Sequence, residues 1–122
     1  MKFYLCEHCK NVAVKAVDAG VPLVCCGQKM TELVPGTSDG AAEKHLPVWS
    51  EKDGHVVVRV GDVAHPMAAE HNISFVALET QKGFQIKYLQ PGQEPQAEFA
   101  LADGEKVEAV YAYCNLHGLW KS

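Results

Sequence analysis

The stretch ISFVALETQKGFQIKYLQ, residues 73–90, is the part of the sequence that says most about the fold. Two segments with many β-branched and aromatic residues, 73–80 and 84–90, flank the turn-forming Gln81-Lys82-Gly83. Segments of this kind around a short loop that contains glycine are typical of a β-hairpin. We therefore predict two antiparallel strands in this stretch.

Other parts of the chain carry the same pattern. Asp53-Gly54 and Asp103-Gly104 are residue pairs favoured in tight turns, and β-forming segments lie beside both. The further predicted strands are residues 47–50, 55–60, 97–101 and 106–113. About six short strands at close spacing predict an antiparallel β-sandwich. The only helical segment that we expect is about one turn, around residues 67–70.

Composition and charge argue against several classes of protein. The 122 residues, of 13.3 kDa, allow one modest core, and a hydrophobic fraction of 48% argues against intrinsic disorder. With 11 basic and 15 acidic residues the net charge is −4, which does not suit binding to nucleic acid. There is no apolar run of the roughly 18 residues that a membrane span needs, and no signal-peptide segment before Cys6. We therefore expect a soluble, cytoplasmic protein that binds neither nucleic acid nor membrane.

The chain has five cysteines, an odd number that favours metal or redox chemistry over disulfide bonds in a reducing compartment. The adjacent Cys25 and Cys26 support this, because neighbouring Cα atoms lie about 3.8 Å apart whereas a disulfide prefers about 4.4–6.8 Å. Two adjacent thiols are better suited to bind one metal ion together. With the Cys6-x2-Cys9 pair they predict a four-thiolate site for zinc or iron. His8, between the first two cysteines, is expected to face solvent.

The first 35 or so residues are predicted to form a separate module. Residues 11–17 are a predicted strand, and residues 35–40, PGTSDG, are rich in turn-forming residues and predict a linker. A module of this size buries too little apolar surface to fold alone, so it needs a metal or a crosslink. The four cysteines would provide that metal site.

A second group of potential ligands lies in the rest of the chain: His45, His65, His71, Cys114 and His117. Each residue alone is more often a surface or core residue than a ligand. Together they outnumber the ligands of a tetrahedral zinc site, and five nitrogen and sulfur donors suit iron with a sixth position open. We do not include His55 among these ligands.

Five motifs, in order along the chain, resemble those of desulfoferrodoxin, the family of two-iron superoxide reductases. The match extends over nearly the whole chain. Phe75 stands where the family pattern has tryptophan, which affects local packing and not a ligand. The motifs are Cys6-x2-Cys9…Cys25-Cys26, Glu43-Lys44-His45-Leu46-Pro47, His65-Pro66-Met67, Glu70-His71-Asn72-Ile73 and Cys114-Asn115-Leu116-His117-Gly118-Leu119-Trp120.

The resemblance implies an all-β protein with a small desulforedoxin-like metal module, residues 1–36, followed by an immunoglobulin-like antiparallel β-sandwich, residues 37–122. It also implies two iron ions per chain. One is a rubredoxin-type iron bound by Cys6, Cys9, Cys25 and Cys26. The other is the active iron, with His45, His65, His71 and His117 as equatorial ligands and Cys114 as the axial ligand.

By the same resemblance, the expected activity is one-electron reduction of superoxide to hydrogen peroxide. A rubredoxin-like protein would donate the electrons, and the chain would form a homodimer in the cytoplasm of an oxygen-sensitive cell. Lys44 is expected to attract superoxide and to help deliver protons through a water molecule. Glu43 is similar to the family glutamate that occupies the sixth position in the oxidised resting state.

Two other functions remain open at this point. The first is an electron carrier in which the cysteine-bound iron does the biological work. The second is a zinc-stabilised interaction module in which the four histidines are incidental. Visible colour separates the zinc protein from the other two, because only iron gives thiolate-to-metal charge transfer, and addition of superoxide separates enzyme from carrier.

Overall fold

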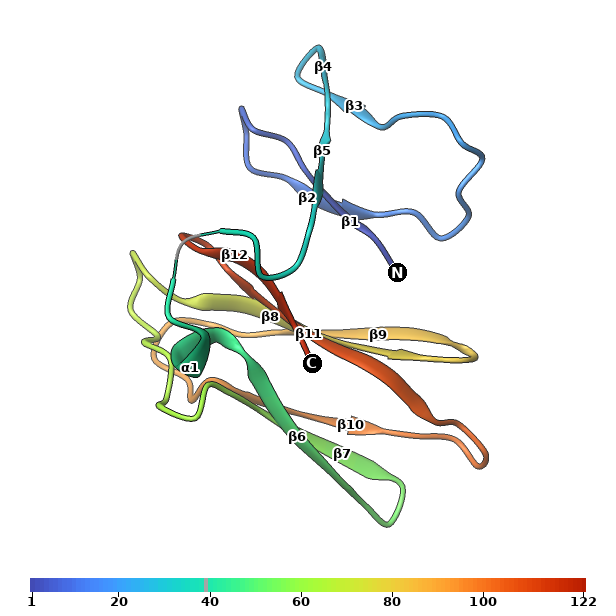
Figure 1. The fold of residues 1–122 in the computed structure, drawn as a ribbon, viewed down its shortest axis with the longest axis vertical. Coiled ribbons are helices and arrows are strands. Elements are labelled where there is room, and N and C mark those ends of the chain that lie inside the picture. Colours follow the sequence, from blue (N-terminus) through green and yellow to red (C-terminus); the bar gives the residue numbers. More distant parts are fainter. Residues whose placement is uncertain (39) are drawn as a thin grey trace. The chain divides into compact units, whose positions relative to one another are not determined.

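The computed structural model describes residues 1–38 and 40–122, and the chain divides into two compact units, Met1–Val34 and Pro35–Ser122 (Figure 1). Asp39, part of the predicted linker, lies outside the described residues. The predicted all-β class is confirmed, since helix α1 (Ala42–His45) is the single α-helix in the described ranges. Within these same ranges, no helix has the length and apolar character needed to cross a membrane.

The first unit consists of short strands and tight turns. Its three-stranded antiparallel sheet has the order β2-β1-β5, and a separate two-stranded hairpin joins β3 to β4. The predicted strand 11–17 is shorter than expected and ends at Val14. Beyond it the chain turns, because the Lys15 Nζ donates to Asp18 Oδ1 at 3.0 Å and to the Val21 carbonyl at 2.7 Å. The strands are β1 (Phe3–Leu5), β2 (Val12–Val14), β3 (Val24–Cys25), β4 (Gln28–Lys29) and β5 (Thr31–Leu33).

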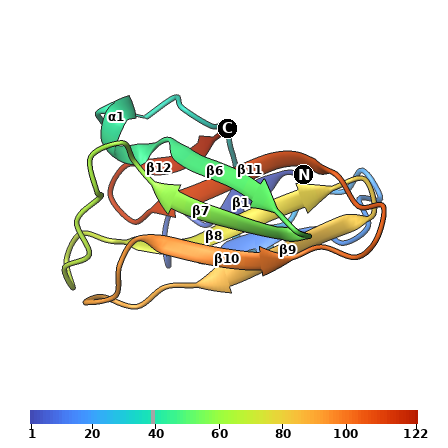
Figure 2. The same cartoon turned by 90° about the horizontal axis from the view of Figure 1, so that it is seen from below.

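The second unit is the predicted antiparallel sandwich, and Figure 2 shows its two sheets stacked face to face. One sheet has the order β10-β7-β6 and the other β12-β11-β8-β9. All the strands predicted here are present, with bounds that differ by at most two residues, and only β12 was not predicted. The strands are β6 (Pro47–Lys52), β7 (His55–Val60), β8 (Ile73–Thr80), β9 (Gly83–Tyr88), β10 (Gln96–Ala100), β11 (Val107–Cys114) and β12 (Gly118–Lys121).

The core of the sandwich follows from the two-residue period of its strands. Val56, Val58 and Val60 on β7 are buried while the residues between them are exposed, so one face of the strand packs against the opposite sheet. Each buried side chain of this size stabilises the fold by roughly 1.5–3 kcal/mol. The same apolar cluster includes Ile73 at the start of β8 and Cys114 at the end of β11, so both strands meet the core at one end of the sandwich.

The predicted helical turn at residues 67–70 is wrong. Ala68 and His71 instead exchange backbone hydrogen bonds, N–H to carbonyl in both directions at 2.9 and 3.2 Å. The Asn72 side chain donates to the carbonyls of Ala68 and Ala69 at 3.0 and 3.2 Å. Because these groups are already paired within a tight loop, the segment does not form the i to i+4 bonds of a helix.

Candidate metal centres

The first cysteine pair lies on a tight turn that follows β1. The Cys6 N–H donates to the Asn11 carbonyl at 2.9 Å, and the Lys10 N–H donates back to the Cys6 carbonyl at 2.8 Å. The turn is closed by Lys10, whose φ of 70° is in the left-handed region. The backbone of this turn therefore folds around the two thiols, with Cys6 at the start of the turn and Cys9 near its tip.

The adjacent pair is separated by the change from strand to turn. Cys25 ends β3, while Cys26 and Gly27 form the two-residue turn to β4 with φ values of 52° and 73°. Two consecutive left-handed residues define a type I′ turn, the favoured two-residue hairpin connection. A left-handed conformation costs a residue other than glycine roughly 1–2 kcal/mol. At Cys26 this conformation lets two neighbouring thiols face the same side.

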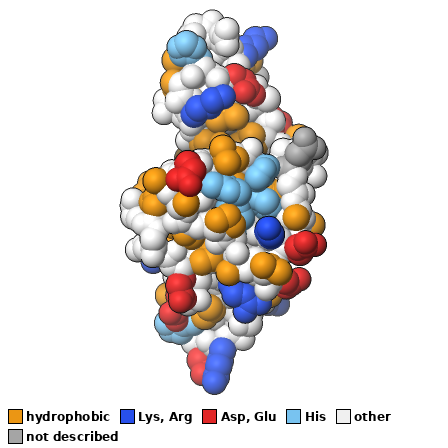
Figure 3. Space-filling model, turned by 90° about the vertical axis from the view of Figure 1, so that its left-hand side faces the viewer, with side chains coloured by type: hydrophobic (Ala, Val, Ile, Leu, Met, Phe, Trp, Pro, Cys, Tyr) orange, Lys and Arg blue, Asp and Glu red, His pale blue; other side chains and the backbone are white. Residues whose placement is uncertain are grey.

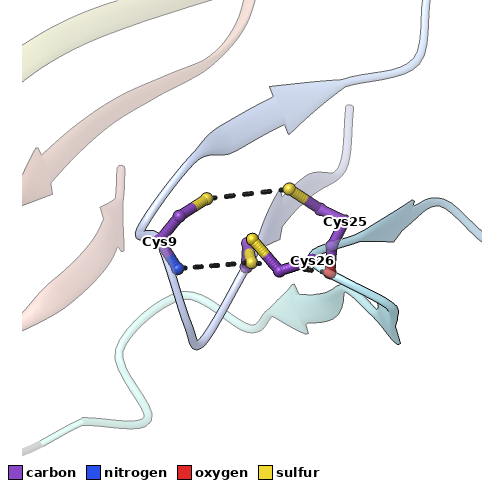
Figure 4. Close-up of side chains that lie close together, drawn as sticks. Cys9, Cys25 and Cys26 are labelled. Carbon is purple, nitrogen blue, oxygen red and sulfur yellow. Dashed lines mark hydrogen bonds between the residues drawn. The ribbon is translucent and has the colours of Figure 1, made fainter.

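The four sulfur atoms of Cys6, Cys9, Cys25 and Cys26 all lie within 4.8 Å of one another. Figure 4 shows the thiols of Cys9 and Cys25 turned toward each other, with their sulfur atoms 3.6 Å apart, and Cys26 beside them. A tetrahedral ion with metal–sulfur bonds of about 2.3 Å needs sulfur separations of this size. The group is therefore preformed for a metal.

Hydrogen-bond donors surround these sulfurs. The Cys9 N–H lies 3.5 Å from the Cys6 sulfur and the Asn11 Nδ2 lies 3.7 Å from the Cys25 sulfur. The Cys9 N–H is the main reason that the pKa of Cys6 is lowered to about 6. The pKa of Cys26 is raised to about 12 because it donates to the neighbouring Cys9 and Cys6 sulfurs. One thiolate is thus favoured without metal, and a cation is needed to hold four.

The second group of ligands comes from four separate segments of the sandwich. His45 ends α1, and His65 and His71 lie on the long connection between β7 and β8. Cys114 is the last residue of β11, and His117 lies on the turn to β12. Figure 3 shows histidines gathered in one surface patch, surrounded mainly by hydrophobic side chains.

The four imidazole rings lie at the corners of a square. Neighbouring ring centroids are 4.6 to 5.1 Å apart, around the order His45, His65, His71, His117. The diagonal from His45 to His71 is longer, at 6.5 Å, and neighbouring rings are inclined by 71 to 84°. Three of the rings, those of His45, His65 and His71, offer nitrogen atoms that lie within 4.8 Å of one another.

The Cys114 sulfur lies close to this square. It is within 4.8 Å of the ligand nitrogens of His45, His65 and His71, with which it forms one candidate metal group. His117 is not a member of that group, but its Nδ1 lies 3.1 Å from His45 Nε2 and 3.8 Å from the Cys114 sulfur. The structure thus groups four of the five predicted ligands of the second centre and places His117 beside them.

Two of the imidazoles are oriented by backbone carbonyls. Nδ1 of His45 lies 2.8 Å from the Ala41 carbonyl, and Nδ1 of His65 lies 2.7 Å from the Pro66 carbonyl. Because a carbonyl can only accept, Nδ1 carries the proton, which leaves the Nε2 lone pair as the possible metal ligand. In the described residues, the buried Nε2 atoms of His65 and His71 have no hydrogen-bond partner. Buried polar atoms are normally paired, so these two nitrogens fit the role of metal ligands.

Burial also keeps the group in its metal-binding form. Burial lowers the pKa of His45 and lowers that of His65 to about 4, so both imidazoles are neutral near pH 7. Burial raises the pKa of the Cys114 thiol, and the N–H groups of Leu116 and His117 lower it in part. A metal ion would therefore displace a proton from Cys114 and none from the two buried imidazoles.

The two predicted catalytic residues lie on α1, directly before His45. The side chains of Glu43 and Lys44 are exposed. Burial is the main reason that the pKa of His45 is lowered, and the charges of His117 and His71 lower it further. The positive charge of Lys44 makes a smaller contribution in the same direction. His8 and His55 are exposed and lie outside both ligand groups, as predicted.

Helix α1 is held in place by the turn after β7. The Gly61 N–H donates to the Leu46 carbonyl at 2.9 Å, and the Val63 N–H donates to the Glu43 carbonyl at 3.2 Å. Gly61 has a φ of 85°, and a Cβ atom at this position would lie 2.6 Å from the Lys44 carbonyl oxygen. Only glycine allows the two backbones to approach this closely.

We therefore expect Gly61→Ala to reduce iron binding at the histidine centre and to lower Tm. The added methyl group collides with the backbone of α1 and so displaces His45. Gly104→Ala is the matched control, since Gly104 has a φ of 81° with no atom within 4 Å of the added Cβ. Thermal unfolding and iron content of both variants check this. If Tm and iron content decreased equally in Gly61→Ala and Gly104→Ala, the strained backbone conformation, and not contact with α1, would be the cause.

Other supporting residues were not predicted from the sequence. The Trp120 ring stacks on His45 with centroids 4.9 Å apart and donates its Nε1–H to the His117 carbonyl at 3.0 Å. Trp120 belongs to a motif that we noted, but nothing in the sequence indicates which atoms it contacts. Phe75, the departure from the family pattern, stacks on Tyr113 with centroids 5.4 Å apart.

An all-β chain with a four-thiolate group and a separate group of imidazoles and one thiolate is a metalloprotein with two centres of different ligand type. Comparison with known proteins places it more closely: the Desulfoferrodoxin family model matches residues 37–122, and the chain belongs to this family.

Three similar proteins show how far the likeness extends. Desulfoferrodoxin of Nitratidesulfovibrio vulgaris is 43% identical over 123 residues, which cover 99% of this chain and 94% of the relative. The crystal structure of the superoxide reductase from Treponema pallidum has a TM-score of 0.82 and 38% identity, and covers 98% of both chains. The superoxide reductase (1Fe-SOR) from Giardia intestinalis has a TM-score of 0.56 and 36% identity, and covers 66% of this chain and 95% of its own.

Proposed function

We propose that the chain is a superoxide reductase with two iron centres. The observation that carries this proposal is the square of four imidazoles with one cysteine sulfur beside it, in which two buried Nε2 atoms have no protein partner. Two structurally similar proteins of more than 35% identity are superoxide reductases. The proposal assigns residues 1–36 to the four-cysteine iron module and residues 37–122 to the reductase domain.

The ligand assignment of the active centre is part of this proposal. Four imidazoles and one thiolate are too many donors for a tetrahedral zinc site, and they suit iron with one open position. The imidazoles of His45, His65, His71 and His117 would hold the active iron together with the Cys114 sulfur, in the equatorial and axial positions that the family resemblance implies. In the other centre, Cys6, Cys9, Cys25 and Cys26 would bind the second iron.

In the reaction, superoxide takes one electron and two protons and becomes hydrogen peroxide, and an external donor restores the electron. Ferrous iron, when bound, provides that electron at an open coordination position. Neutral imidazoles leave the positive charge of the ion intact, whereas the Cys114 thiolate increases electron density on it. His71 and His117 are only half-buried, so the small anion can reach the centre from their side.

We assign two roles to residues of α1. Lys44 attracts superoxide and orients a water molecule that delivers protons, because it is an exposed cation one residue from a ligand. Glu43, two residues before His45, is the carboxylate that would occupy the open position in the oxidised enzyme. Neither role requires the side chain to bind the iron during reduction of superoxide.

The proposal also includes the setting of the reaction. A rubredoxin-like protein would donate the electrons, the chain would act as a homodimer, and the reaction would take place in the cytoplasm. The two alternatives, electron carrier and zinc-stabilised interaction module, are separated from the reductase by one series of measurements. Zinc protein is colourless, and a carrier that contains iron would not consume superoxide faster than buffer.

Replacing Lys44 with alanine is expected to slow the second-order reaction with superoxide by roughly tenfold, within the range known for electrostatic steering. Iron content and the visible spectrum should stay unchanged, because lysine is not a ligand. Higher ionic strength should slow the parent more than the variant, since salt screens the charge that the variant lacks. Pulse generation of superoxide at two salt concentrations measures both effects.

Two variants serve as controls for Lys44→Ala. Lys44→Arg keeps the charge and should keep most of the rate. Lys82→Ala also removes one positive charge, from the turn between β8 and β9. This turn lies at the opposite end of β8 from His71, so the variant should react like the parent. If Lys44→Ala keeps the parent rate and salt dependence, the charge of the iron alone attracts superoxide and Lys44 has no such role.

A further inference from the structure

An amide side chain that is not a ligand joins two of the segments that carry the candidate ligands, the loop of His71 and the end of β11. The Asn115 Nδ2 donates to the Glu70 carbonyl at 3.0 Å, and the Asn115 Oδ1 accepts from the Asn72 N–H at 2.9 Å. The Asn115 N–H also donates to the Asn72 carbonyl at 3.2 Å. Glu70 and Asn72 flank His71, so one planar amide group holds the backbone on both sides of this histidine.

This contact lies where regular strand pairing ends. Along β8 and β11, Tyr113 pairs with Phe75 but Cys114 pairs with Ile73, so Ser74 is an extra residue on β8 and the ladder has a bulge. Past the bulge, no strand backbone remains to align the loop before β8 with the end of β11. Asn115 continues the alignment by one step, through its side chain as well as its backbone.

His71 is less buried than the two imidazoles that backbone carbonyls orient. His45 and His65 are oriented at Nδ1 by backbone carbonyls, and both are 2% exposed. His71 is half-buried, and its Nε2 has no protein partner. The Asn115 amide does not contact the His71 ring. It bonds the backbone groups of Glu70 and Asn72, on either side of the histidine.

We propose that Asn115 is a positioning residue of the histidine and cysteine centre, which sets the distance between the His71 ring and the Cys114 sulfur before the metal binds. This inference rests on the proposed function, since it takes the metal to be the active iron. Residues that orient metal ligands typically change metal affinity about 10- to 100-fold when they are replaced.

The chain contains a matched control for this amide group. Gln81 Nε2 donates to the Gly104 carbonyl at 2.8 Å, and Gln81 Oε1 accepts from the Lys106 N–H at 2.8 Å. Its amide therefore bridges two peptide groups on either side of one residue, as Asn115 does. Gln81 follows the last residue of β8, whereas Asn115 contacts the segment before the first. The 8 residues of β8 lie between these two places, a length of roughly 27 Å.

The test compares Asn115→Ala with Gln81→Ala in the full iron-loaded chain. Each variant loses two hydrogen bonds between a side-chain amide and the backbone, so Tm should fall by a few degrees, and by a similar amount, in both. Release of iron to a chelator, followed by the visible bands of the two centres, should be at least about tenfold faster from the histidine centre of Asn115→Ala alone. The four-cysteine centre should release its iron at the parent rate in both variants.

A second measurement uses the parent protein and does not depend on any variant. The Asn72 amide hydrogen should exchange with solvent slowly for a residue in a loop, because Asn115 accepts it. Equal iron release from the two variants, or rapid exchange at Asn72 in the parent, would overturn the proposal. Failure of the parent to reduce superoxide, with the difference in iron release intact, would overturn the proposed function and leave the role of Asn115 standing.

Discussion

Replacing Cys114 with serine is expected to lower the rate of superoxide reduction by at least about 100-fold. A serine hydroxyl is a harder and weaker donor than a thiolate, so it would bind iron poorly and would not increase its electron density. The thiolate charge-transfer band of the histidine centre should disappear, while the spectrum of the four-cysteine iron remains. Visible spectroscopy, iron content and superoxide consumption measure the three effects.

A control is needed because Cys114 is fully buried in the apolar cluster. The change to serine places a hydroxyl in the core, which alone destabilises the fold by about 1–3 kcal/mol. Val110→Thr places a hydroxyl at another fully buried position of β11 without touching the centre. That variant should lose stability and keep its activity and spectrum. If Cys114→Ser retained the band and the turnover, Cys114 would not be the axial ligand.

The second large effect is expected for Cys9→Ser in the small unit. This change should abolish the four-cysteine iron and its colour, and it should unfold or loosen residues 1–34, because metal binding provides most of the folding free energy of such small modules. Most superoxide reduction should remain, since the five proposed ligands of the other iron all lie in the second unit.

Cys9 is exposed, so its replacement should have little effect other than through the metal. Activity, iron content and far-ultraviolet circular dichroism of the variant check this prediction. Loss of more than about nine-tenths of the activity, with the histidine centre still loaded, would show that the two centres depend on each other and would contradict the proposed independence.

The sandwich was predictable because its strands obey simple local rules. The buried valines of β7 alternate with exposed residues, and Asp53 and Gly54 form the predicted turn with φ values of 52° and 75°. The short strands of the small unit, such as β3 and β4, have two residues each and no periodicity that a sequence could reveal. The metal and the turn at Cys26, more than strand propensity, determine that part of the fold.

The candidate ligands could be proposed from the motifs, but the groups that place them could not. Nothing in the sequence indicates that Gly61 lies against the backbone of Lys44 or that Asn115 holds both sides of His71. Contacts of this kind arise only when segments far apart in the sequence meet. The expected helix at residues 67–70 failed for a different, local reason, because Ala68, His71 and the Asn72 side chain pair with one another within the loop.

The measurement that tests the central claim most directly is the product yield of the reduced, iron-loaded protein after a pulse of superoxide. A reductase supplies one electron to each superoxide, so the account predicts rapid consumption of superoxide, one hydrogen peroxide for each superoxide and no release of oxygen. Two iron ions per chain should be found in the same sample. Consumption no faster than in buffer, or one hydrogen peroxide for every two superoxides with release of oxygen, would contradict it.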